Sequence, residues 1–152
     1  MDTNRRTALK AVAMVGAPAA GLLKSAGAWA QAWNKAAFET KSLNDTVKAM
    51  GGASAAESKD IVITSPDIAE NGAVVPFTIA SKIPKTESIS LLVEKNPNVL
   101  AASFGIPDGT EAGVTTRVKM GQTSNVMALV KADGKFYYAS KEVKVTLGGC
   151  GG

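Results

Sequence analysis

The only cysteine of the chain, Cys150, lies two residues before the carboxyl terminus and is flanked on both sides by a pair of glycines. These glycines are Gly148, Gly149, Gly151 and Gly152. Because glycine has no Cβ and adopts both signs of φ, residues 148–152 are expected to form a flexible C-terminal arm. At about 3.3–3.6 Å per residue, Cys150 would reach about 13–14 Å from Thr146. A thiol on such a slim arm is suited to enter narrow sites in other proteins.

The neighbouring sequence contains no group that would activate the thiol of Cys150. The chain has no histidine, and neither a lysine cluster nor a predicted helix N-terminus lies beside the cysteine. The terminal carboxylate opposes thiolate formation. With the ordinary cysteine pKa of about 8.5, only a few per cent of the thiol is ionised at pH 7. This predicts a handle on which other enzymes act, comparable to a lipoyl or phosphopantetheine arm, and not a catalytic nucleophile.

The composition excludes most other kinds of active site. Without histidine, the chain cannot form a Ser-His-Asp or Cys-His catalytic group, a histidine-ligated zinc or copper site, or a haem site with a histidine ligand. A single cysteine forms no CxxC pair, zinc ribbon or iron–sulfur site. The glycine pairs match neither GxGxxG nor a P-loop. No catalytic residue, cofactor or metal is therefore expected.

Two acidic pairs and one arginine leave minor alternatives open. Asp67 with Glu70, and Asp108 with Glu111, lie at predicted turn boundaries. They are interpreted as solvated turn residues, with a carboxylate pair or calcium site as the less favoured alternative. Arg117 is the only arginine after residue 30. It is interpreted as an exposed charge, with anion or partner binding as the alternative.

The positive charge of the chain is concentrated at its N-terminus. The net charge is +4, from 17 basic and 13 acidic residues. Residues 1–30 carry four basic residues and one acidic residue, a balance of +3, which leaves 13 basic against 12 acidic residues in the remainder. A nearly neutral domain with dispersed charges does not have the electrostatic footprint of a protein that binds nucleic acid or an anionic membrane.

Residues 1–30 have the organisation of a signal peptide. The pair Arg5 and Arg6 precedes 13 small and apolar residues, and "AWA" lies before Gln31. This pattern predicts a twin-arginine (Tat) signal, cleavage after about Ala30 and a periplasmic location. Ala8 replaces the bulky apolar residue that is common in the Tat motif, so a Sec signal remains the alternative. The apolar stretch is shorter than the roughly 20 residues that span a bilayer, so no permanent membrane anchor is expected.

The mature chain divides into a short helical segment and a β domain. Residues 31–52 have apolar residues at helical spacing, with Ser42 as a predicted N-cap, Asp45 in the first turn, and a stop at Gly51 and Gly52. Residues 51–58 are interpreted as a linker. The β-sandwich domain is assigned to residues 53–147 and the arm to residues 148–152.

All the remaining segments have the pattern of strands. The predicted strands are 60–65, 73–81, 88–95, 99–105, 113–120, 124–132 and 135–147. Asn71-Gly72 predicts a turn and Asp133-Gly134 a hairpin, whereas Pro76 favours a sheet edge or a bulge. Tyr137 and Tyr138 should point to opposite faces, one into the core and the other to the surface or an interface. About seven short strands without intervening helices predict an all-β fold, an antiparallel β-sandwich.

The C-terminal sequence "KVTLGGCGG", with "TSNVMALVKADGKFYYASKEV" before it, resembles the SoxY family of sulfur carrier proteins. The resemblance extends through "IVITSPDIAENGAVVPFTI", "ISLLVEKNPNVLAASF" and "TTRVKMGQTSNV". It implies an immunoglobulin-like sandwich that catalyses nothing itself and carries thiosulfate-derived sulfur on Cys150. It also implies a SoxZ-like β-sandwich partner that is exported together with this chain. The implied enzymes are SoxAX, which loads thiosulfate, SoxB, which releases sulfate, and SoxCD where it is present.

An exported protein with a single cysteine also has a different interpretation. In an oxidising compartment an unpaired cysteine is either a deliberately free thiol or one half of an intermolecular disulfide. The alternative function is therefore a structural or binding β-sandwich that uses Cys150 to form such a disulfide. A thiol enzyme is disfavoured because nothing in the sequence beside Cys150 lowers its pKa.

Overall fold

The computed structural model describes residues 34–146. The predicted signal peptide 1–30, the first residues of the helical segment and the arm 148–152 with Cys150 lie outside the described residues. Within residues 34–146, no helix is long and apolar enough to cross a membrane.

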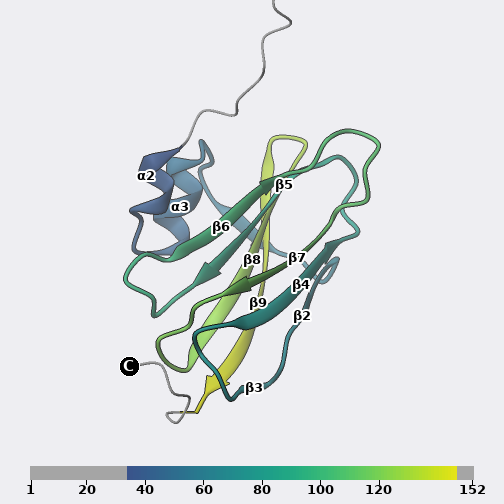
Figure 1. The fold of residues 1–152 in the computed structure, drawn as a ribbon. Helices are drawn as coiled ribbons and strands as arrows, with labels where there is room; N and C mark the ends of the chain where they lie inside the picture. Colours follow the sequence, from purple (N-terminus) through teal and green to yellow (C-terminus); the bar gives the residue numbers. More distant parts are fainter. Residues whose placement is uncertain (1–33, 147–152) are drawn as a thin grey trace, which may run out of the picture. The chain divides into compact units, whose positions relative to one another are not determined.

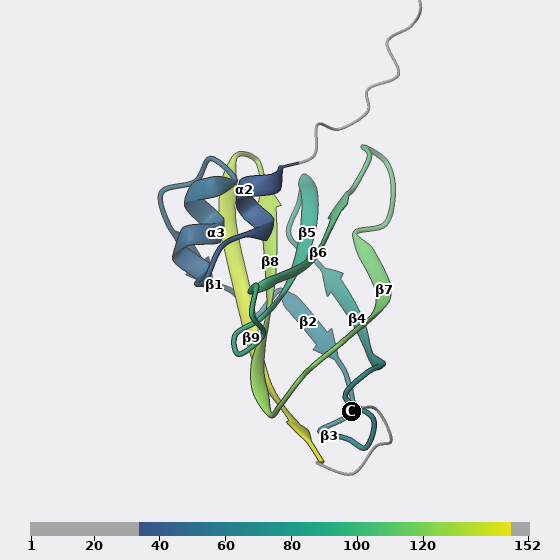
Figure 2. The ribbon, with the colours of Figure 1, turned by 60° about the vertical axis from the view of Figure 1, so that its left-hand side comes forward.

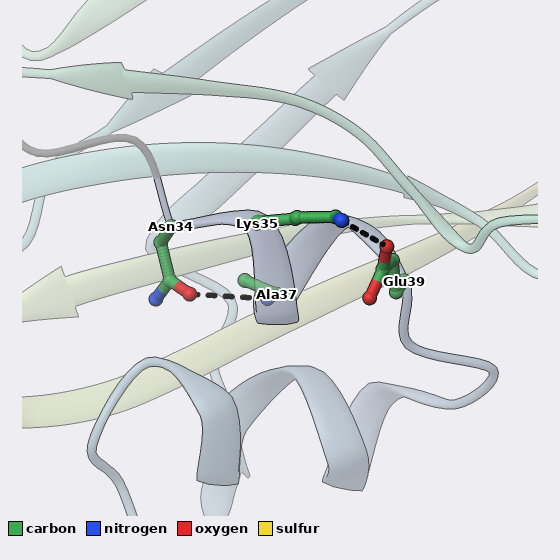
Figure 3. A network of polar contacts seen from close by, with 4 residues as sticks. All are labelled: Asn34, Lys35, Ala37 and Glu39. Atoms are coloured by element: carbon green, nitrogen blue, oxygen red, sulfur yellow. Dashed lines mark hydrogen bonds and ion pairs between the residues drawn. The ribbon is translucent and has the colours of Figure 1, made fainter.

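The helical segment contains two short helices, α2 (Lys35–Phe38) and α3 (Leu43–Ala49). The side chain of Asn34 caps α2 by accepting a hydrogen bond from the Ala37 amide at 3.1 Å, and Lys35 forms an ion pair with Glu39 at 3.6 Å (Figure 3). The sequence did not predict the break between the helices. The Thr40 hydroxyl, which donates to the Ala37 carbonyl at 2.7 Å, lies at this break.

The beginning and end of α3 follow the prediction from the sequence. Ser42 is the N-cap residue, and its hydroxyl oxygen accepts a hydrogen bond from the Asp45 amide at 3.1 Å. Asp45 lies in the first turn, where its negative charge interacts favourably with the helix dipole. The chain leaves the helix through Gly51, whose φ of 89° is accessible to glycine at little cost.

Nine strands form two sheets within the described residues. The strands are β1 (Ala55–Glu57), β2 (Ile61–Thr64), β3 (Ile68–Ala69), β4 (Val75–Ser81), β5 (Thr86–Val93), β6 (Leu100–Gly105), β7 (Gly113–Val118), β8 (Ser124–Ala132) and β9 (Lys135–Val145). The larger sheet has the order β1-β9-β8-β5-β6, with β3 also paired to β9, and the smaller sheet has the order β2-β4-β7 (Figure 1). The all-β sandwich is confirmed.

The described residues form three layers, with the two helices on one side of the larger sheet and β2-β4-β7 on its other side (Figure 2). The core between the sheets includes Phe77, Ile79 and Leu91. A second apolar cluster, which includes Val47 of α3 and Phe136 of β9, joins the helices to the larger sheet. The larger sheet is therefore packed against β2-β4-β7 on one face and, around Phe136, against the helices on the other.

All seven predicted strands are present, but β1 and β3 were not predicted. β1 lies in the segment interpreted as a linker, and β3 lies within the predicted turn region before Asn71. Both pair in parallel with the outer edge of β9, through Ala55↔Phe136 to Glu57↔Tyr138 and through Ile68↔Lys144 and Ala69↔Val145. The prediction of a purely antiparallel arrangement is therefore wrong at this edge. These two- and three-residue strands have no readable periodicity of their own, and pairing with β9 defines them.

The Asp133-Gly134 hairpin is confirmed and joins β8 to β9. Asp133 has φ 48° and Gly134 has φ 73°, the two positive values that a type I′ turn requires. Ala132 pairs with Lys135 directly across this turn, and the ladder continues to Ser124↔Val143. The tight turn thus sets the register of the two longest strands.

The expectation for Pro76 needs correction, whereas Tyr137 and Tyr138 lie on opposite faces as expected. Pro76 does not lie at a sheet edge, because β4 is the central strand of its sheet. The proline is tolerated because β2 ends opposite Thr78, so Pro76 faces a ladder partner on the β7 side alone. Tyr137 and Tyr138 point to opposite faces, as expected, and both are half-buried. Tyr137 packs on the core between the sheets and Tyr138 on the cluster under the helices.

Candidate functional site

The part of the candidate site that the structure describes is the end of β9 at Val145 and the following Thr146, which lies four residues before Cys150. The backbone is held on the β3 side up to the last described residue. The Lys144 amide donates to the Asp67 carbonyl at 2.9 Å, and the Thr146 amide donates to the Ala69 carbonyl at 3.1 Å. The base of the arm is therefore an ordered strand end.

The other side of the β9 end is held by Thr123, in the loop before β8. Its hydroxyl oxygen accepts a hydrogen bond from the Val145 amide at 3.0 Å, and the same hydroxyl donates to the Val145 carbonyl at 3.5 Å. One side chain thus replaces the ladder partner that β8 no longer supplies, because the β8–β9 ladder ends at Ser124↔Val143. The sequence offered no signal for this contact.

Gly72 brings a third segment close to the end of β9. Its carbonyl accepts a hydrogen bond from the Met120 amide at 2.7 Å. A Cβ at this position would collide with the Met120 carbonyl oxygen and would lie 2.8 Å from Cγ1 of Val145. The predicted turn at Asn71-Gly72 is therefore also a site of close approach, where the β3–β4 and β7–β8 connections meet the β9 end.

A lysine fastens the β2–β3 connection to β9 near this point. Nζ of Lys141 donates to the Ser65 carbonyl at 2.7 Å and forms an ion pair with Asp67 at 3.0 Å. Lys141 is half-buried, whereas the Asp67 side chain is 88 % exposed, so the ion pair itself is largely screened by solvent. The contact to the carbonyl oxygen is what holds the connection against the strand.

The described residues around the base of the arm supply no catalytic or metal-binding group. Asp67, Glu70, Asp108 and Glu111 are all exposed at turns. No group of three or more histidine, cysteine or acidic residues that could hold a metal occurs in residues 34–146. The interpretation of the acidic residues as solvated turn residues agrees with this arrangement. Arg117 is exposed on β7, as expected.

The carboxyl group with a shifted pKa lies at the other end of β9, beside the hairpin. Glu87 accepts from Nζ of Lys131, 3.0 Å away, and from the Gly134 amide at 3.0 Å. The hydrogen bond from Lys131, followed by that from Gly134, lowers the pKa of Glu87. These contacts join β5, β8 and the hairpin turn, which indicates a structural role.

An open cavity of about 340 Å³ also lies at the hairpin end. Its lining includes Ser54, Lys135 and Tyr137. Phe136 also lines the cavity, and Val145 follows it nine positions later along β9. At about 3.3 Å per residue this is about 30 Å, more than twice the reach of the arm. The cavity therefore cannot receive Cys150 of the same chain.

Comparison with known proteins provides information on residues that the structure does not describe. The model of the family described as "Sulfur oxidation protein SoxY" matches residues 47–150, a range that includes Cys150. The structure of the sulfur carrier protein SoxY from Chlorobium limicola f thiosulfatophilum is similar, with a TM-score of 0.63 and 40% sequence identity. That match covers 69% of this chain and 96% of the Chlorobium chain.

A structure of the bacterial superantigen toxic shock syndrome toxin-1 is a much weaker match. It has a TM-score of 0.40 and 12% identity, and covers 57% of this chain and 99% of that chain. These values are too low to support an argument about fold or function. The comparison with curated proteins gave no match.

Proposed function

The chain belongs to the SoxY family of sulfur oxidation proteins, and from this membership we propose that it carries sulfur intermediates covalently on Cys150. The observation that supports this most directly is that the family match extends through residue 150. The role in sulfur oxidation follows from the family. The attachment residue, the arm and the partners named below are the proposal.

The proposed loading step joins the Cys150 thiol to thiosulfate. The thiol sulfur bonds to the outer sulfur of thiosulfate and gives Cys–S–S–SO₃⁻, with release of one proton and two electrons. A SoxAX-like haem protein accepts the electrons. A SoxB-like enzyme then adds water to the terminal sulfur, which leaves as sulfate with two protons, while Cys–S–S⁻ remains on the carrier.

Further enzymes regenerate the thiol in this proposal. Where a SoxCD-like enzyme is present, it oxidises the remaining outer sulfur with three water molecules and gives Cys–S–SO₃⁻, while six protons are released and six electrons pass to an electron acceptor of that enzyme. A second hydrolysis by the SoxB-like enzyme then releases sulfate and one proton and restores the free cysteine. The carrier presents the sulfur and performs none of these reactions. In support, the chain contains no histidine to act as a base.

The described end of β9 suits a carrier. The Val145 amide donates to the Thr123 hydroxyl and the Thr146 amide donates to the Ala69 carbonyl, and these hydrogen bonds fix the chain up to Thr146. The four glycines then leave only Leu147 and Cys150 with side chains in the last six residues. A fixed base limits where the arm begins, and a chain with few side chains is thin enough to enter the active sites of partner enzymes.

The proposed location is the periplasm, reached by the twin-arginine pathway through the signal at Arg5 and Arg6. That pathway exports folded proteins, so a SoxZ-like subunit without its own signal would be exported as a complex with this chain. Both statements rest on residues 1–30 and on the family resemblance.

The test is the mass of the mature protein purified from cells that oxidise thiosulfate. We expect adducts on Cys150 that are absent from Cys150→Ser, while the two proteins melt at the same temperature. If wild type carries only the free thiol, or only a disulfide between two chains that thiosulfate does not affect, the carrier proposal is wrong. The second of these results would favour the structural alternative.

A further inference from the structure

Three consecutive backbone amides at the end of β9 are hydrogen-bonded alternately on two sides of the strand. The amides of Lys144 and Thr146 donate to carbonyl groups on the β3 side, at 2.9 and 3.1 Å. The Val145 amide between them donates in the other direction, to the hydroxyl of Thr123 in the loop before β8, at 3.0 Å. The strand end is therefore held from both sides up to Thr146.

Thr123 makes with its side chain the pair of contacts that a strand residue makes with its backbone. Its hydroxyl accepts from the Val145 amide at 3.0 Å and donates to the Val145 carbonyl at 3.5 Å. In an antiparallel ladder, a hydrogen-bonded residue of the neighbouring strand exchanges the same two bonds. The backbone pairing of β8 with β9 ends two residues earlier, at Val143. A single hydroxyl thus extends the supported part of β9 from Val143 to Val145.

The loop that carries Thr123 is itself fastened to its surroundings. The side chain of Asn96, in the β5–β6 connection, donates to the Lys119 carbonyl at 2.8 Å. Directly after Thr123, the Ser124 hydroxyl accepts a hydrogen bond from the Lys95 amide at 3.0 Å. Because the loop is held at both ends, its hydroxyl restrains the end of β9 and does not move with it.

We propose that Thr123 is a positioning residue of the carrier, which fixes the point from which the predicted arm moves. With Thr123 in place the chain is held up to Thr146, and Cys150 is the fourth residue beyond it. Without this hydroxyl the pairing with β8 ends at Val143, and Cys150 is the seventh residue beyond that point. The reach grows from about 13–14 Å to about 23–25 Å. The inference rests on the proposed function for the role of Cys150.

The β3 side alone is a weak support for this part of the chain. β3 has only the two residues Ile68–Ala69, and it pairs with β9 outside the main order of the sheet. Strand ends have opening free energies that approach zero. Loss of the Thr123 hydroxyl should therefore increase the open population at Val145–Thr146 about fivefold, which is the effect of one ordinary hydrogen bond.

A fixed starting point concentrates the thiol near the strand end. The effective concentration of the end of a flexible tether falls as about the −3/2 power of the tether length. A free segment of seven residues in place of four lowers this concentration about twofold. It also brings the sulfur to positions along β9 that the wild-type arm does not reach. Thr123 therefore determines which positions the sulfur visits, without contact to the sulfur itself.

The experiment introduces a second cysteine on β9 of the mature protein and measures its disulfide formation with Cys150 in a glutathione redox buffer. Ser140 is exposed and lies six residues before Thr146, about 20 Å away. A disulfide adds about 6 Å between Cα atoms, so the wild-type arm extends just to its limit at this position. Ser140→Cys should therefore form the disulfide slowly, and about fivefold faster when combined with Thr123→Val.

Three control variants accompany this measurement. Glu142→Cys lies about 13 Å before Thr146, within reach in both backgrounds, so its disulfide should form at similar rates with and without Thr123→Val. Thr123→Ser keeps the hydroxyl and should restore the wild-type rate at Ser140→Cys. Thr86→Val is the matched control, because Thr86 is also half-buried and its hydroxyl donates to the Ile83 carbonyl at 2.8 Å, near the hairpin end. It should not change the rate.

Loading of thiosulfate by the purified SoxAX-like enzyme of the same organism measures the functional effect. With Thr123→Val, kcat should fall about twofold, because the thiol is spread over a larger volume around the docked carrier. KM for the carrier should be unchanged, because the substitution leaves the rest of the surface intact. Thr123→Ser and Thr86→Val should match wild type in both constants. Melting temperatures of all variants are compared, so that a loss of folding is recognised.

Three results would overturn the positioning role. The disulfide rate at Ser140→Cys is the same with and without Thr123→Val, or Thr123→Ser does not restore the wild-type rate, or kcat is unchanged although the disulfide forms faster. The disulfide measurement needs no sulfur substrate, so it can fail while Cys150 still carries adducts. Absence of adducts would overturn the carrier proposal and would leave the disulfide rates as they are, so the two failures are distinguishable.

Discussion

At the scale of single residues, the proposed carrier combines a hydrogen-bonded strand end with a segment that consists mostly of glycine. Cys150 is surrounded by glycines, whereas Val145 and Thr146 are hydrogen-bonded to Thr123 and Ala69. Thr146, the last described residue, lies four residues before Cys150 in the sequence. Gly72 has a different role from the glycines of the arm, because it is required by close packing and not by freedom of the backbone.

Gly72→Ala should destabilise the protein by about 1–3 kcal/mol, because the new Cβ collides with a backbone carbonyl that cannot move cheaply. The colliding atom is the Met120 carbonyl oxygen, and Cγ1 of Val145 lies 2.8 Å from the same Cβ. Urea denaturation followed by far-UV circular dichroism measures the loss. Gly113→Ala is the control, because its Cβ would meet only the Ile79 carbonyl oxygen at 3.8 Å. Equal stability of the two variants would contradict the packing described at Gly72.

At the scale of the elements, β9 connects the two ends of the domain. Its first residues form the hairpin with β8, its middle holds Lys141 against the β2–β3 connection, and its last residues lead to the arm. The hairpin end is reinforced by Glu87, which accepts hydrogen bonds from Lys131 and Gly134. Because different residues stabilise the two ends of β9, substitutions can test the contribution of each end separately.

Acid should weaken the hairpin end through Glu87. Its folded pKa is lowered from the ordinary value of 4.5, mainly by the hydrogen bond from Lys131. A lowered pKa means that the folded state favours the ionised carboxylate, so the contribution to stability is complete above 4.5 and is lost as the pH falls through the folded value. The difference in unfolding free energy between wild type and Glu87→Gln should therefore be largest near pH 7 and should decrease below pH 4.5.

The measurement is urea denaturation of both proteins across this pH range. Because the Glu87 side chain is 44% exposed, solvent screens its interactions and the expected difference in unfolding free energy is small. A control substitution is therefore needed. Glu111→Gln, at an exposed turn, is the control for the loss of one surface carboxylate. A constant difference between wild type and Glu87→Gln from pH 7 to pH 3 would show that the carboxylate charge makes no contribution.

The sequence predicts the elements that depend on local chemistry. Ser42 with Asp45 defines the start of α3, and Asp133-Gly134 defines the hairpin. The alternation of apolar and polar residues between predicted turns identifies seven of the strands. β1 and β3 escape prediction because each has too few residues to show a period and exists only through its pairing with β9. The Thr123 contact with Val145 joins residues 22 apart, so no local pattern reveals it.

The same limit applies to the candidate site. The sequence alone predicts the proposed arm, because Cys150 and its glycines are identified by composition and position along the chain. The outer face of β2-β4-β7 combines three strands that are not adjacent in sequence, so it is identified only when their order and register are known. A surface that several strands form together can be identified only from the structure, whereas the arm is predicted from the sequence alone.

At the scale of the whole described domain, the helices and the sandwich should unfold together. Phe136 and Val47 belong to the cluster that joins them, and a Cβ at Gly52 would lie 2.5 Å from Phe136 and 2.8 Å from Val47. Gly52→Ala should therefore cost about 1–3 kcal/mol through overpacking. Gly121→Ala, where a Cβ meets nothing within 4 Å, should change stability by less than about 0.5 kcal/mol.

Native-state hydrogen exchange distinguishes a cooperative domain from a detachable helical segment. If the two clusters form one unit, Gly52→Ala lowers the opening free energy of amides in α3 and in β8 by the same amount. A loss confined to α3, with the β8 amides protected as in wild type, would mean that the helices open separately. In that case the sandwich alone would hold the base of the arm, and the helices would be free to take part in contacts of their own.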